Sequence, residues 1–571
     1  MRTLSTQRTR KKVERLKFDF FVFDVETTKL EPQPKNFVFG VLYGFAFVKV
    51  IKTITDFKKE FSKKKYKGKT IFAHNAEFDL STIFGNIYIN MDNSAIFNGR
   101  FISAKWNGVT FADSFNIFPS SVYNVGKTMG IDKIENEKVK VGKLRKNNIT
   151  QLDIDYCKRD CEIVYKALLR LFEMVGAIKI TISSLAMYEF RNKFLSDKIV
   201  FSELVDEFYN SYYGGRVECF KIGKVNANCF DINSIYPFAM INTTFPDIQR
   251  LKKETKISLI YFDYLLRNFE GLANVDVYHE PTYFGYLPVK TDKLIFPIGR
   301  FNTTVNFNEL RFAISKGVVK VEKVHFAVFA NAIETPFKDF VNHNYNGRIE
   351  SKNPLDNLIY KLKLNSLYGR FAMRIKYNTT YHEMLPFDII EELDKNEKFY
   401  ELKLFNEKRN DCFLITENDK FKNSFFAIPT FSSYITSYAR IYLLQSLIEN
   451  ENNNVVYCDT DSIFLENNFV GLLGNDLGQW KKEKKQVIEI NGLKNYRYVL
   501  NGETFNTIKG ISKKSIQINE NTFEIVKYYK TKESLRRNLE TGKQYIQTKT
   551  LKHTYDKRIV LPNGNTKPIE L

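Results

Sequence analysis

The stretch Val455-Val456-Tyr457-Cys458-Asp459-Thr460-Asp461-Ser462-Ile463-Phe464 places two aspartates around one threonine, between two apolar runs. Runs of β-branched and aromatic residues favour strands, so the stretch predicts a tight β-hairpin with both carboxylates at its tip. Residues two apart on an extended chain point the same way, and Asp459 and Asp461 would therefore face one spot. Carboxylates that close repel each other unless a cation lies between them, and Mg²⁺ binds carboxylate oxygens readily. A plain solvated turn is the alternative, because Asp and Thr are common turn residues.

The composition indicates a large basic protein. The chain has 571 residues, 43% of them hydrophobic, which is enough for buried cores in several domains. Its formal net charge of +21 predicts a nucleic-acid partner, because basic surfaces neutralise phosphates and release counterions. Solubility alone is the plainer explanation of this charge. The six cysteines form no CxxC pair, which indicates reduced thiols in an intracellular protein.

No membrane association is expected from the hydrophobic pattern. The longest apolar run, Phe37 to Ile51, is too short and too interrupted by glycine to span a bilayer, and it predicts paired strands. Residues 1–17 are basic and nearly free of acidic residues. A mitochondrial presequence is one explanation, but the segment lacks a clear apolar face, which favours a flexible basic arm.

Paired acids also occur in the first third of the chain. Residues 17–25 predict a buried central strand that ends with Asp24 and Glu26 on one face. Paired acids at the end of a buried strand need a reason, because unpaired buried charge is costly. A second predicted strand, Thr70 to Ala73, leads to Asp79 at the start of a helix.

A tyrosine and a fourth acid follow on a predicted helix, where Tyr156 and Asp160 lie four residues apart and share one face. In this order the residues resemble the DEDDy 3′–5′ exonuclease domain of family B DNA polymerases, over about residues 18–175. The resemblance implies that two metal ions activate a water and stabilise the departing 3′ oxygen. It assigns catalysis to Asp24, Glu26, Asp79, Tyr156 and Asp160, with Asp24, Glu26 and Asp160 as metal ligands and Tyr156 orienting the water. It also implies contacts to a single-stranded 3′ end by Thr27, Asn75, Phe78 and Ser114, and assistance from one lysine among Lys138, Lys140 and Lys143.

Two further motifs accompany the hairpin. In Cys229-Phe230-Asp231-Ile232-Asn233-Ser234-Ile235-Tyr236-Pro237 a strand ends at Asp231, a third acid for the proposed metal site. A helix is predicted through Lys361-Leu362-Lys363-Leu364-Asn365-Ser366-Leu367-Tyr368-Gly369-Arg370, with a cation, an amide and a ring on one stripe. Such a stripe suits a nucleotide, although most charged stripes are simply the solvated face of a helix. The predicted nucleotide-binding residues are Tyr236, Lys361, Asn365 and Tyr368, with Arg348 and Lys352 as further phosphate ligands.

The three motifs, DINSIYP, KLKLNSLYG and YCDTDS, resemble in order the polymerase motifs of family B DNA polymerases. The resemblance implies that Asp231 and Asp461 bridge two metal ions with the Ile232 carbonyl as a further ligand, and that Asp459 supports them. It implies a Tyr236 ring that excludes a 2′-hydroxyl. Further DNA contacts are expected from the YxGG-like, TxxAR-like and KxY-like elements, namely Tyr212, Gly214, Gly215, Thr436, Arg440, Lys494 and Tyr496.

The resemblance implies a multidomain α/β and α+β fold. An RNase H-like exonuclease domain is expected over residues 1–180, including the basic arm, followed by a right-hand polymerase domain over 181–571. The palm is expected around 215–240 and 430–480, the fingers at about 346–372 and the thumb at about 500–571. Insertions are expected at about 241–345 and 374–425.

The short chain and the long gap between Pro237 and Lys361 resemble the protein-primed subgroup of small bacteriophages and linear plasmids. This implies a terminal protein that contacts the first insertion, and processive, strand-displacing synthesis with DNA encircled by the second. The expected partners are template and primer DNA, dNTPs and the terminal protein, with the chain monomeric or paired with that protein. Two Mg²⁺ ions per active site are expected, with Mn²⁺ as a second option, and the location is the host cytoplasm.

Other classes of protein fit less well. A nuclease alone would not need the three acids of the second half, and a catalytically degenerate DNA-binding protein does not explain two ordered sets of acids. Tyr236 and the exonuclease motifs argue against a reverse transcriptase or an RNA polymerase. The nearest alternative is a family B enzyme that extends a nucleic-acid primer.

Overall fold

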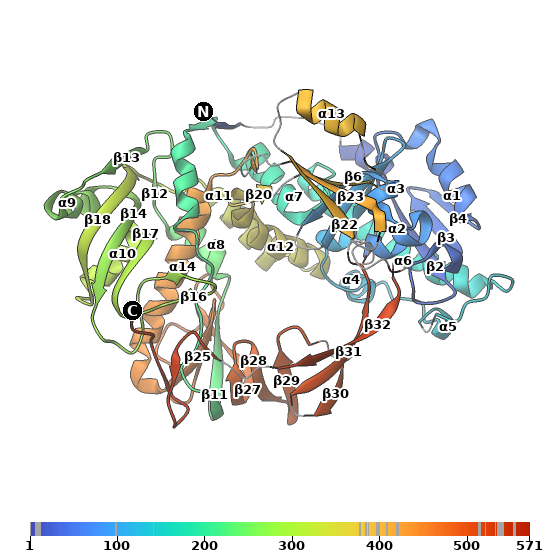
Figure 1. The fold of residues 1–571 in the computed structure, drawn as a ribbon. Helices are drawn as coiled ribbons and strands as arrows, with labels where there is room; N and C mark the ends of the chain where they lie inside the picture. Colours follow the sequence, from blue (N-terminus) through green and yellow to red (C-terminus); the bar gives the residue numbers. More distant parts are fainter. Residues whose placement is uncertain are drawn as a thin grey trace.

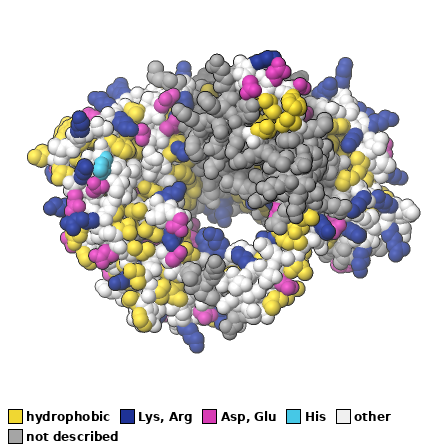
Figure 2. Space-filling view, viewed as in Figure 1, with side chains coloured by type: hydrophobic (Ala, Val, Ile, Leu, Met, Phe, Trp, Pro, Cys, Tyr) yellow, Lys and Arg dark blue, Asp and Glu magenta, His cyan; other side chains and the backbone are white. Residues whose placement is uncertain are grey.

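The computed structural model describes the chain from residue 2 to residue 571 with several gaps. The described residues are 2–5, 13–97, 100–140, 142–375, 378–382, 385, 387–395, 400–406, 409–417, 422–511, 515–519, 521–530, 533, 539, 542–551 and 555–571. The ribbon runs around an open middle, with the N-terminal third on one side and the last strands closing the bottom (Figure 1). The space-filling view shows an opening at the same place, with Lys and Arg side chains at its rim (Figure 2).

A seven-stranded mixed sheet organises the N-terminal third, in the order β4-β3-β2-β5-β8-β7-β6. Strands β2, β5 and β8 are parallel neighbours, and the other pairings are antiparallel. The strands are β2 (Phe20–Thr27), β3 (Phe37–Gly44), β4 (Phe47–Ile51), β5 (Thr70–Ala73), β6 (Asp92–Phe97), β7 (Arg100–Trp106) and β8 (Val109–Asp113). The predicted strand pair within 37–51 is therefore confirmed as β3 and β4.

This sheet is buried on both faces, which explains the nearly continuous apolar run of β2. On one face Phe20 and Val22 pack with α6 (Gln151–Val175). On the other face Phe23 and Val25 pack with α1 (Ile54–Phe61) and α2 (Ala76–Phe84). Helix α6 begins at a Thr150–Asp153 capping box, ends at Gly176 in the left-handed conformation, and carries the predicted Tyr156 and Asp160. Short helices in this part are α3 (Ile87–Asn90), α4 (Val122–Thr128) and α5 (Glu137–Lys140).

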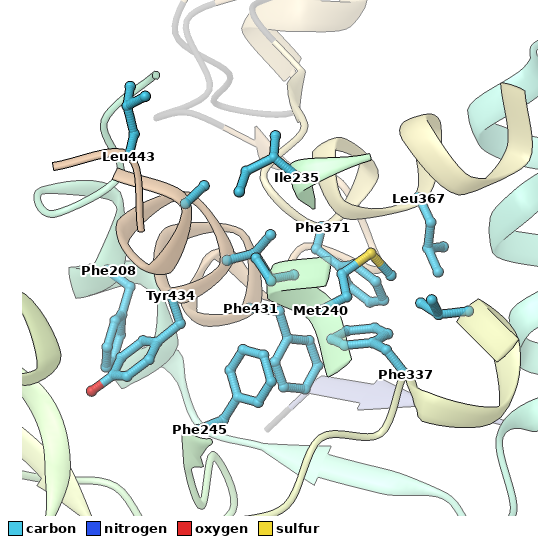
Figure 3. Packing of buried hydrophobic residues seen from close by; sticks show 14 of the residues in the cluster. Phe208, Ile235, Met240, Phe245, Phe337, Leu367, Phe371, Phe431, Tyr434 and Leu443 are labelled. Atoms are coloured by element: carbon cyan, nitrogen blue, oxygen red, sulfur yellow. The ribbon is translucent and has the colours of Figure 1, made fainter. Parts of the chain in front are cut away.

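A second seven-stranded sheet, entirely antiparallel and called the palm-like sheet below, occupies the other half in the order β10-β25-β26-β11-β27-β28-β29. Its strands are β10 (Val217–Cys219), β11 (Gly223–Ile232), β25 (Val455–Asp459), β26 (Ser462–Leu465), β27 (Trp480–Gly492), β28 (Asn495–Leu500) and β29 (Glu503–Ile508). Helices α8 (Ile235–Asn242) and α14 (Pro429–Glu449) contribute to the core beside this sheet. In that core, Phe245, Phe337 and Phe371 each meet the Phe431 ring nearly edge to face (Figure 3).

Helices α11 (Lys338–Glu350) and α12 (Pro354–Phe371) form a pair between the two sheets. Leu355 and Ile359 of α12 belong to the core beneath the N-terminal sheet, so α12 is not confined to the second half. Arg170 of α6 also holds Asp356 with two hydrogen bonds, of 2.8 and 2.5 Å. Deeper in, Lys363 pairs with Glu189 of α7 (Ile182–Glu189) at 2.9 Å, with both side chains buried.

Along the chain, between strands β11 and β25 of the palm-like sheet, residues form a separate four-stranded sheet in the order β13-β18-β14-β17. Its core is distinct and includes residues of α9 (Leu259–Asn268) and α10 (Phe307–Ser315). The strands are β13 (Lys252–Thr255), β14 (Glu270–His279), β17 (Gly299–Asn306) and β18 (Val319–Ala330). The minor pairs nearby are β12 (Phe245–Pro246) with β19 (Ala332–Ile333), and β15 (Val289–Lys290) with β16 (Leu294–Ile295).

A second inserted unit follows α12. Its base is the pairing of β20 (Arg374–Ile375) with β24 (Lys422–Asn423). It contains α13 (Phe387–Lys395), β21 (Asn378–His382), β22 (Tyr400–Asn406) and β23 (Arg409–Glu417). Beyond β29 lies a three-stranded sheet of β30 (Ile516–Asn519), β31 (Thr522–Tyr528) and β32 (Gln544–Thr550), which reaches toward the N-terminal third (Figure 1).

Several elements lie across the expected domain boundaries. Residues 2–4 of the predicted flexible arm form β1 (Arg2–Leu4), which pairs with β9 (Ile199–Phe201) of the second half. The palm-like sheet continues to Ile508, and α11 begins at Lys338, inside the expected first insertion. Within residues 555–571, expected in the thumb, β33 (Ile559–Val560) pairs with β34 (Thr566–Lys567), and isolated bridges join Asn565 to Lys221 and Glu570 to Ile298. The β1–β9 pair and the two isolated bridges join residues far apart in the chain, and local sequence does not specify such pairings.

Two compositional expectations can be compared with the structure. The described cysteines 157, 161, 219, 229 and 458 are free and buried, while the Cys412 side chain lies outside the described residues. No helix among the described residues is long and apolar enough to cross a membrane.

Candidate active sites

The predicted hairpin is present as β25 and β26, with Asp459 paired to Ser462 across a two-residue turn. Within the turn, the Asp461 amide donates to the Asp459 carbonyl at 2.6 Å, and Thr460 has a φ of 59°. Positive φ is unfavourable for a β-branched residue, so the surroundings must hold this turn. The Thr460 amide donates to the Arg216 carbonyl at 2.7 Å, and the Ile232 amide donates to the Asp461 carbonyl at 2.7 Å. The turn is therefore tied to both neighbouring strands.

Asp231 lies on β11, opposite the same Ser462 that pairs with Asp459, so the hairpin and β11 bring the three acids together. Burial, then the charges of Asp461 and Glu483, raise the pKa of Asp231 to about 7. Burial and the Asp459 charge raise the pKa of Asp461. Raised pKa values at neighbouring carboxylates mean that their negative charges are not fully compensated by the protein. This donor set fits a hard divalent cation.

Cationic and phenolic groups surround these acids. Lys494 lies 3.2 Å from Asp459 Oδ2, and the Tyr457 hydroxyl donates to the same oxygen at 3.3 Å. Tyr496 packs its ring against Tyr457 and Phe464, so the predicted KxY element lies directly behind the hairpin.

The predicted nucleotide residues lie on the elements next to the acids. Tyr236 of α8 stacks on Tyr368 of α12, with ring centroids 4.4 Å apart. On α12, Lys361 and Asn365 are exposed, Tyr368 is partly exposed and Lys363 is buried. The positive charge of Lys361 is among the influences that lower the pKa of Asp231, so this lysine lies in the neighbourhood of that acid.

Two other predicted phosphate ligands lie on or near α11. Arg348 donates to the Ser234 hydroxyl at 3.1 Å, directly before α8. Lys352 is exposed in the connection to α12.

The glycine pair before β10 packs against the catalytic turn. A Cβ on Gly215 would lie 2.7 Å from Thr460 Cγ2, so this position requires glycine. Gly214 is exposed, and a Cβ there meets nothing within 4 Å. Tyr212 is partly buried in the same loop.

Two residues predicted to contact DNA are internal instead. Arg440 is 3% exposed and forms two hydrogen bonds with the Glu309 carboxylate, at 2.8 and 2.9 Å. Its remaining nitrogen donates to the Tyr213 and Gly214 carbonyls, so Arg440 supports the glycine loop. Thr436 is 2% exposed and donates to the Ser433 carbonyl. The side chains of Arg440 and Thr436 are therefore too buried in this structure to contact DNA directly.

A second acid cluster lies at the N-terminal sheet. Asp24 and Glu26 end β2, Asp79 lies in the first turn of α2, and Asp160 comes from α6. The Val25 amide donates to Asp79 Oδ1 at 3.1 Å, and Asp24 and Asp79 share a hydrogen bond. The structure thus brings together all four predicted acids.

Burial dominates the electrostatics of this cluster. Burial, then Asp24 and Asp160, raise the pKa of Glu26 well above its ordinary value. Burial and the Asp24 charge raise the pKa of Asp160 to about 7. Asp24, Glu26 and the Cys157 thiol have ligand atoms within 4.8 Å of one another, and they are the one such group in the described part of the chain. The two carboxylates are the hard ligands, because burial raises the pKa of Cys157 well above its ordinary value and keeps it a thiol.

The lysine at this cluster is Lys133, which the sequence did not indicate. Its Nζ lies 2.6 Å from Asp160 Oδ2 and 4.6 Å from the centre of the Tyr156 ring. Burial raises the pKa of Tyr156 to about 12 despite a hydrogen bond with Lys133. Among the expected candidates, Lys143 is exposed, and the side chains of Lys138 and Lys140 lie outside the described residues. Lys133 belongs to no helical or strand pattern, so spacing gave no signal for it.

The predicted contacts to a single-stranded end divide into surface and interior residues. Asn75 is exposed at the start of α2, and Phe78 is partly exposed one turn later. Thr27 is 4% exposed, with its hydroxyl donating to the Lys29 carbonyl. Ser114 is fully buried, and its hydroxyl bonds the Ala73 carbonyl and His74 Nδ1. The Ser114 side chain is therefore not accessible to DNA in this structure. Its hydroxyl instead links the end of β5 to the segment after β8 through these hydrogen bonds.

The whole fold is similar to solved DNA polymerase structures. The chain of phi29 DNA polymerase complexed with primer-template DNA superposes with a TM-score of 0.68 at 17% identity, covering 93% of this chain and 100% of that chain. The same polymerase with primer-template DNA and incoming nucleotide gives a TM-score of 0.66. At this identity the likeness establishes the fold, an N-terminal α/β domain followed by a right-hand domain.

Sequence relatives agree with that fold. The DNA-directed DNA polymerase of Enterobacteria phage PRD1 is 28% identical over 507 residues, which cover 84% of this chain and 82% of that protein. A probable DNA polymerase of Podospora anserina is 26% identical over 66% of this chain. The chain spans 37% of the Podospora protein and 33% of a probable DNA polymerase of Neurospora intermedia. Residues 131–468, more than half of the chain, match the family described as DNA polymerase type B, organellar and viral. With the acids of two of the three predicted motifs gathered on one sheet, the chain belongs to the organellar and viral type B DNA polymerases.

Proposed function

We propose that this protein synthesises DNA on a DNA template at Asp231, Asp459 and Asp461, and degrades 3′ ends at the N-terminal acid cluster. One observation carries the proposal: a chain of this family holds two separate carboxylate clusters, each at the ends of strands in its own sheet. Both clusters contain carboxyl groups whose pKa is raised to about 7, as crowded metal ligands have before a cation binds.

At the synthesis site, Asp231, Asp461 and the Ile232 carbonyl would hold a pair of Mg²⁺ ions, or Mn²⁺ as a second option, with Asp459 in support. The ions would lower the pKa of the primer hydroxyl and neutralise phosphate charge. Lys361 and Asn365 of α12 face the incoming triphosphate, with Arg348 and Lys352 at its outer end. Tyr236, held flat against Tyr368, lies under the sugar and leaves no room for a 2′-hydroxyl.

At the degradation site, Asp24, Glu26 and Asp160 form the donor set for the two ions. Asp79 fixes Asp24 through their shared hydrogen bond, and Lys133 fixes Asp160. Tyr156, beside Lys133, orients the attacking water. Asn75 and Phe78, both accessible on α2, contact the single-stranded end.

Initiation on a terminal protein is part of the proposal, with synthesis that is processive and displaces the non-template strand. The support is a folded unit with its own core at residues 252–330, between the first two polymerase motifs, where such a partner would bind. Extension of an ordinary nucleic-acid primer is the second candidate. Incubation with a candidate terminal protein and a single dNTP separates them, because only protein priming forms a covalent protein–nucleotide product.

Primer extension on a labelled hairpin DNA, with and without dNTPs, tests both sites together. We expect extension with dNTPs and shortening without them. Asp459→Ala should abolish extension and keep shortening, whereas Asp24→Ala should abolish shortening and keep extension. A wild-type protein that neither extends nor shortens the DNA would refute the proposed function, and loss of both activities in both variants would refute two separate sites.

A further inference from the structure

The catalytic turn depends on a short edge strand. Strand β10 has three residues and pairs with β25 through Val217 opposite Asp459 and Glu218 opposite Cys458. The carbonyl of Arg216, directly before β10, accepts the Thr460 amide at the tip of the turn. The position of β10 therefore sets where Asp459, Thr460 and Asp461 lie, yet three residues of pairing fix a strand only weakly.

Residues 555–566 bind the free edge of β10. The Cys219 amide donates to the Tyr555 hydroxyl at 3.0 Å, and Lys557 Nζ donates to the Val217 carbonyl at 3.2 Å. At the same residue, the Thr566 hydroxyl donates to the Cys219 carbonyl at 2.8 Å. The edge that would otherwise face solvent is thus satisfied by a segment more than 300 residues away in sequence, counting from Cys219 to Tyr555.

A buried chain of charges joins the same segment to the residue before β10. Arg216 Nε donates to Glu218 Oε2 at 2.5 Å, and Arg558 lies 3.5 Å from Glu218 Oε1. The three side chains are at most 1% exposed. Arg558 also donates to the Tyr283 carbonyl at 2.7 Å and to the Thr566 hydroxyl at 2.8 Å. Buried pairs of this kind are costly to break, because the remaining charge stays buried without a partner.

We propose that Arg558 is a positioning residue for DNA synthesis, acting through Glu218 and Arg216 on the turn that carries Asp459 and Asp461. Arg558 does not touch DNA or nucleotide, because its side chain has no exposed surface. It fixes Glu218, Glu218 fixes the Arg216 side chain, and the Arg216 carbonyl holds the Thr460 amide. This inference rests on the proposed synthesis site and adds a structural requirement supplied by residues 555–571.

The test compares Arg558→Met, Arg558→Lys and the control Lys567→Met in the full chain. Lys567 is an exposed residue of the same segment, so its replacement removes one positive charge without touching β10. We expect Arg558→Met to lower the single-turnover extension rate about tenfold or more, since small displacements of reacting groups have effects of this size. The Mg²⁺ concentration for half-maximal extension should rise severalfold.

Three measurements should stay within about twofold of wild type in Arg558→Met: primer-template affinity, the shortening rate without dNTPs, and its Mg²⁺ dependence. Arg558→Lys, which keeps the charge, should recover part of the extension rate, and Lys567→Met should match wild type. The shortening activity serves as an internal measure of folded protein, because it belongs to the other sheet.

Several outcomes would overturn the proposal. Equal losses of extension and shortening would mean that Arg558 only stabilises the fold, and a loss of DNA affinity would mean that it supports binding. Unchanged extension would remove the role altogether. If Arg558→Met is insoluble, Tyr555→Phe is measured instead. This variant removes only the acceptor for the Cys219 amide. An unchanged Mg²⁺ dependence of its extension activity would refute the proposal. Failure of the wild-type protein to extend would refute the proposed function itself. Failure of the Arg558 variants alone to behave as expected would refute only the positioning role of Arg558.

Discussion

Gly215 is the position where one added carbon should harm synthesis most directly. A Cβ there would lie 2.7 Å from Thr460 Cγ2 and Oγ1, inside the catalytic turn. We expect Gly215→Ala to reduce the extension rate by about tenfold or more, since the turn must shift. Gly214→Ala should cost much less, because its Cβ meets no atom within 4 Å. Single-turnover extension of both variants checks this, and equal losses would contradict it.

Lys133 should be required for shortening and dispensable for extension. Its removal leaves Asp160 without its 2.6 Å partner and Tyr156 without its neighbouring cation. We expect Lys133→Met to lower the shortening rate by about ten- to a hundredfold, as loss of a group supporting proton transfer does. Lys143→Met is the matched control, because Lys143 is an exposed lysine in the connection between α5 and α6. Equal rates for Lys133→Met and wild type would argue against this role.

The crowded acids predict an inverse dependence of metal-free stability on pH. Asp160 and Asp231 have pKa values of about 7 in the folded chain against an ordinary 3.8, so the folded state binds more protons between these values. Their contribution to stability is therefore present below about pH 4 and is lost as the pH rises toward 7. With chelator present, the melting temperature should fall between about pH 4.5 and 7, and Mg²⁺ should restore it at about pH 7.5. Replacing both residues by Asn should flatten the slope; an unchanged slope would contradict the assignment.

At the scale of elements, α12 has two opposite faces with different roles: one packs into the core and the other lies near the proposed synthesis site. Ile359 lies in the core beneath the N-terminal sheet, and Lys361 is exposed toward Asp231. We expect Ile359→Ala to destabilise the protein by about 2–5 kcal/mol, as buried Ile→Ala changes do. Lys361→Ala should leave stability unchanged and raise the KM for dNTPs. Thermal melting and steady-state kinetics separate the two effects, and a stability loss in Lys361→Ala would refute the division of faces.

Sequence patterns predicted the elements that local periodicity defines. The hairpin at Asp459, the stripe on α12 and the helix carrying Tyr156 were all readable from spacing within about a dozen residues. Lys133 and Arg558 were not, since their partners lie 27 and 340 residues away and follow no period. The sequence also did not show that Ser114, Thr436 and Arg440 are buried. A polar residue on the surface and a polar residue that joins two elements by hydrogen bonds cannot be told apart from sequence alone. Long-range pairing likewise decides where β1 and residues 555–571 belong.

At the scale of the whole molecule, strands β22 and β23 of the second inserted unit lie above the open middle of the ribbon, on the side of the N-terminal third (Figure 1). The chain of this unit leaves and returns through paired residues, Ile375 opposite Lys422. Replacing the segment between them by a short turn should therefore keep the rest folded. We expect this deletion to shorten the products made in one binding event, on a singly primed circle with a DNA trap, while leaving the rate per nucleotide unchanged. Equal product lengths would show that encirclement by this unit does not hold the DNA.

The pairing of β1 with β9 has a consequence for dividing the protein into fragments. Strand β1, at the start of the described chain, pairs with β9 of the second half, and side chains of α12 pack into the core beneath the N-terminal sheet. A single cut near residue 180 would leave the two pieces interlocked by a strand and a helix. Limited proteolysis there should yield a nicked complex that co-elutes and keeps both activities. Expressed alone, residues 1–180 would expose the apolar surface that Leu355 and Ile359 now cover, and should aggregate.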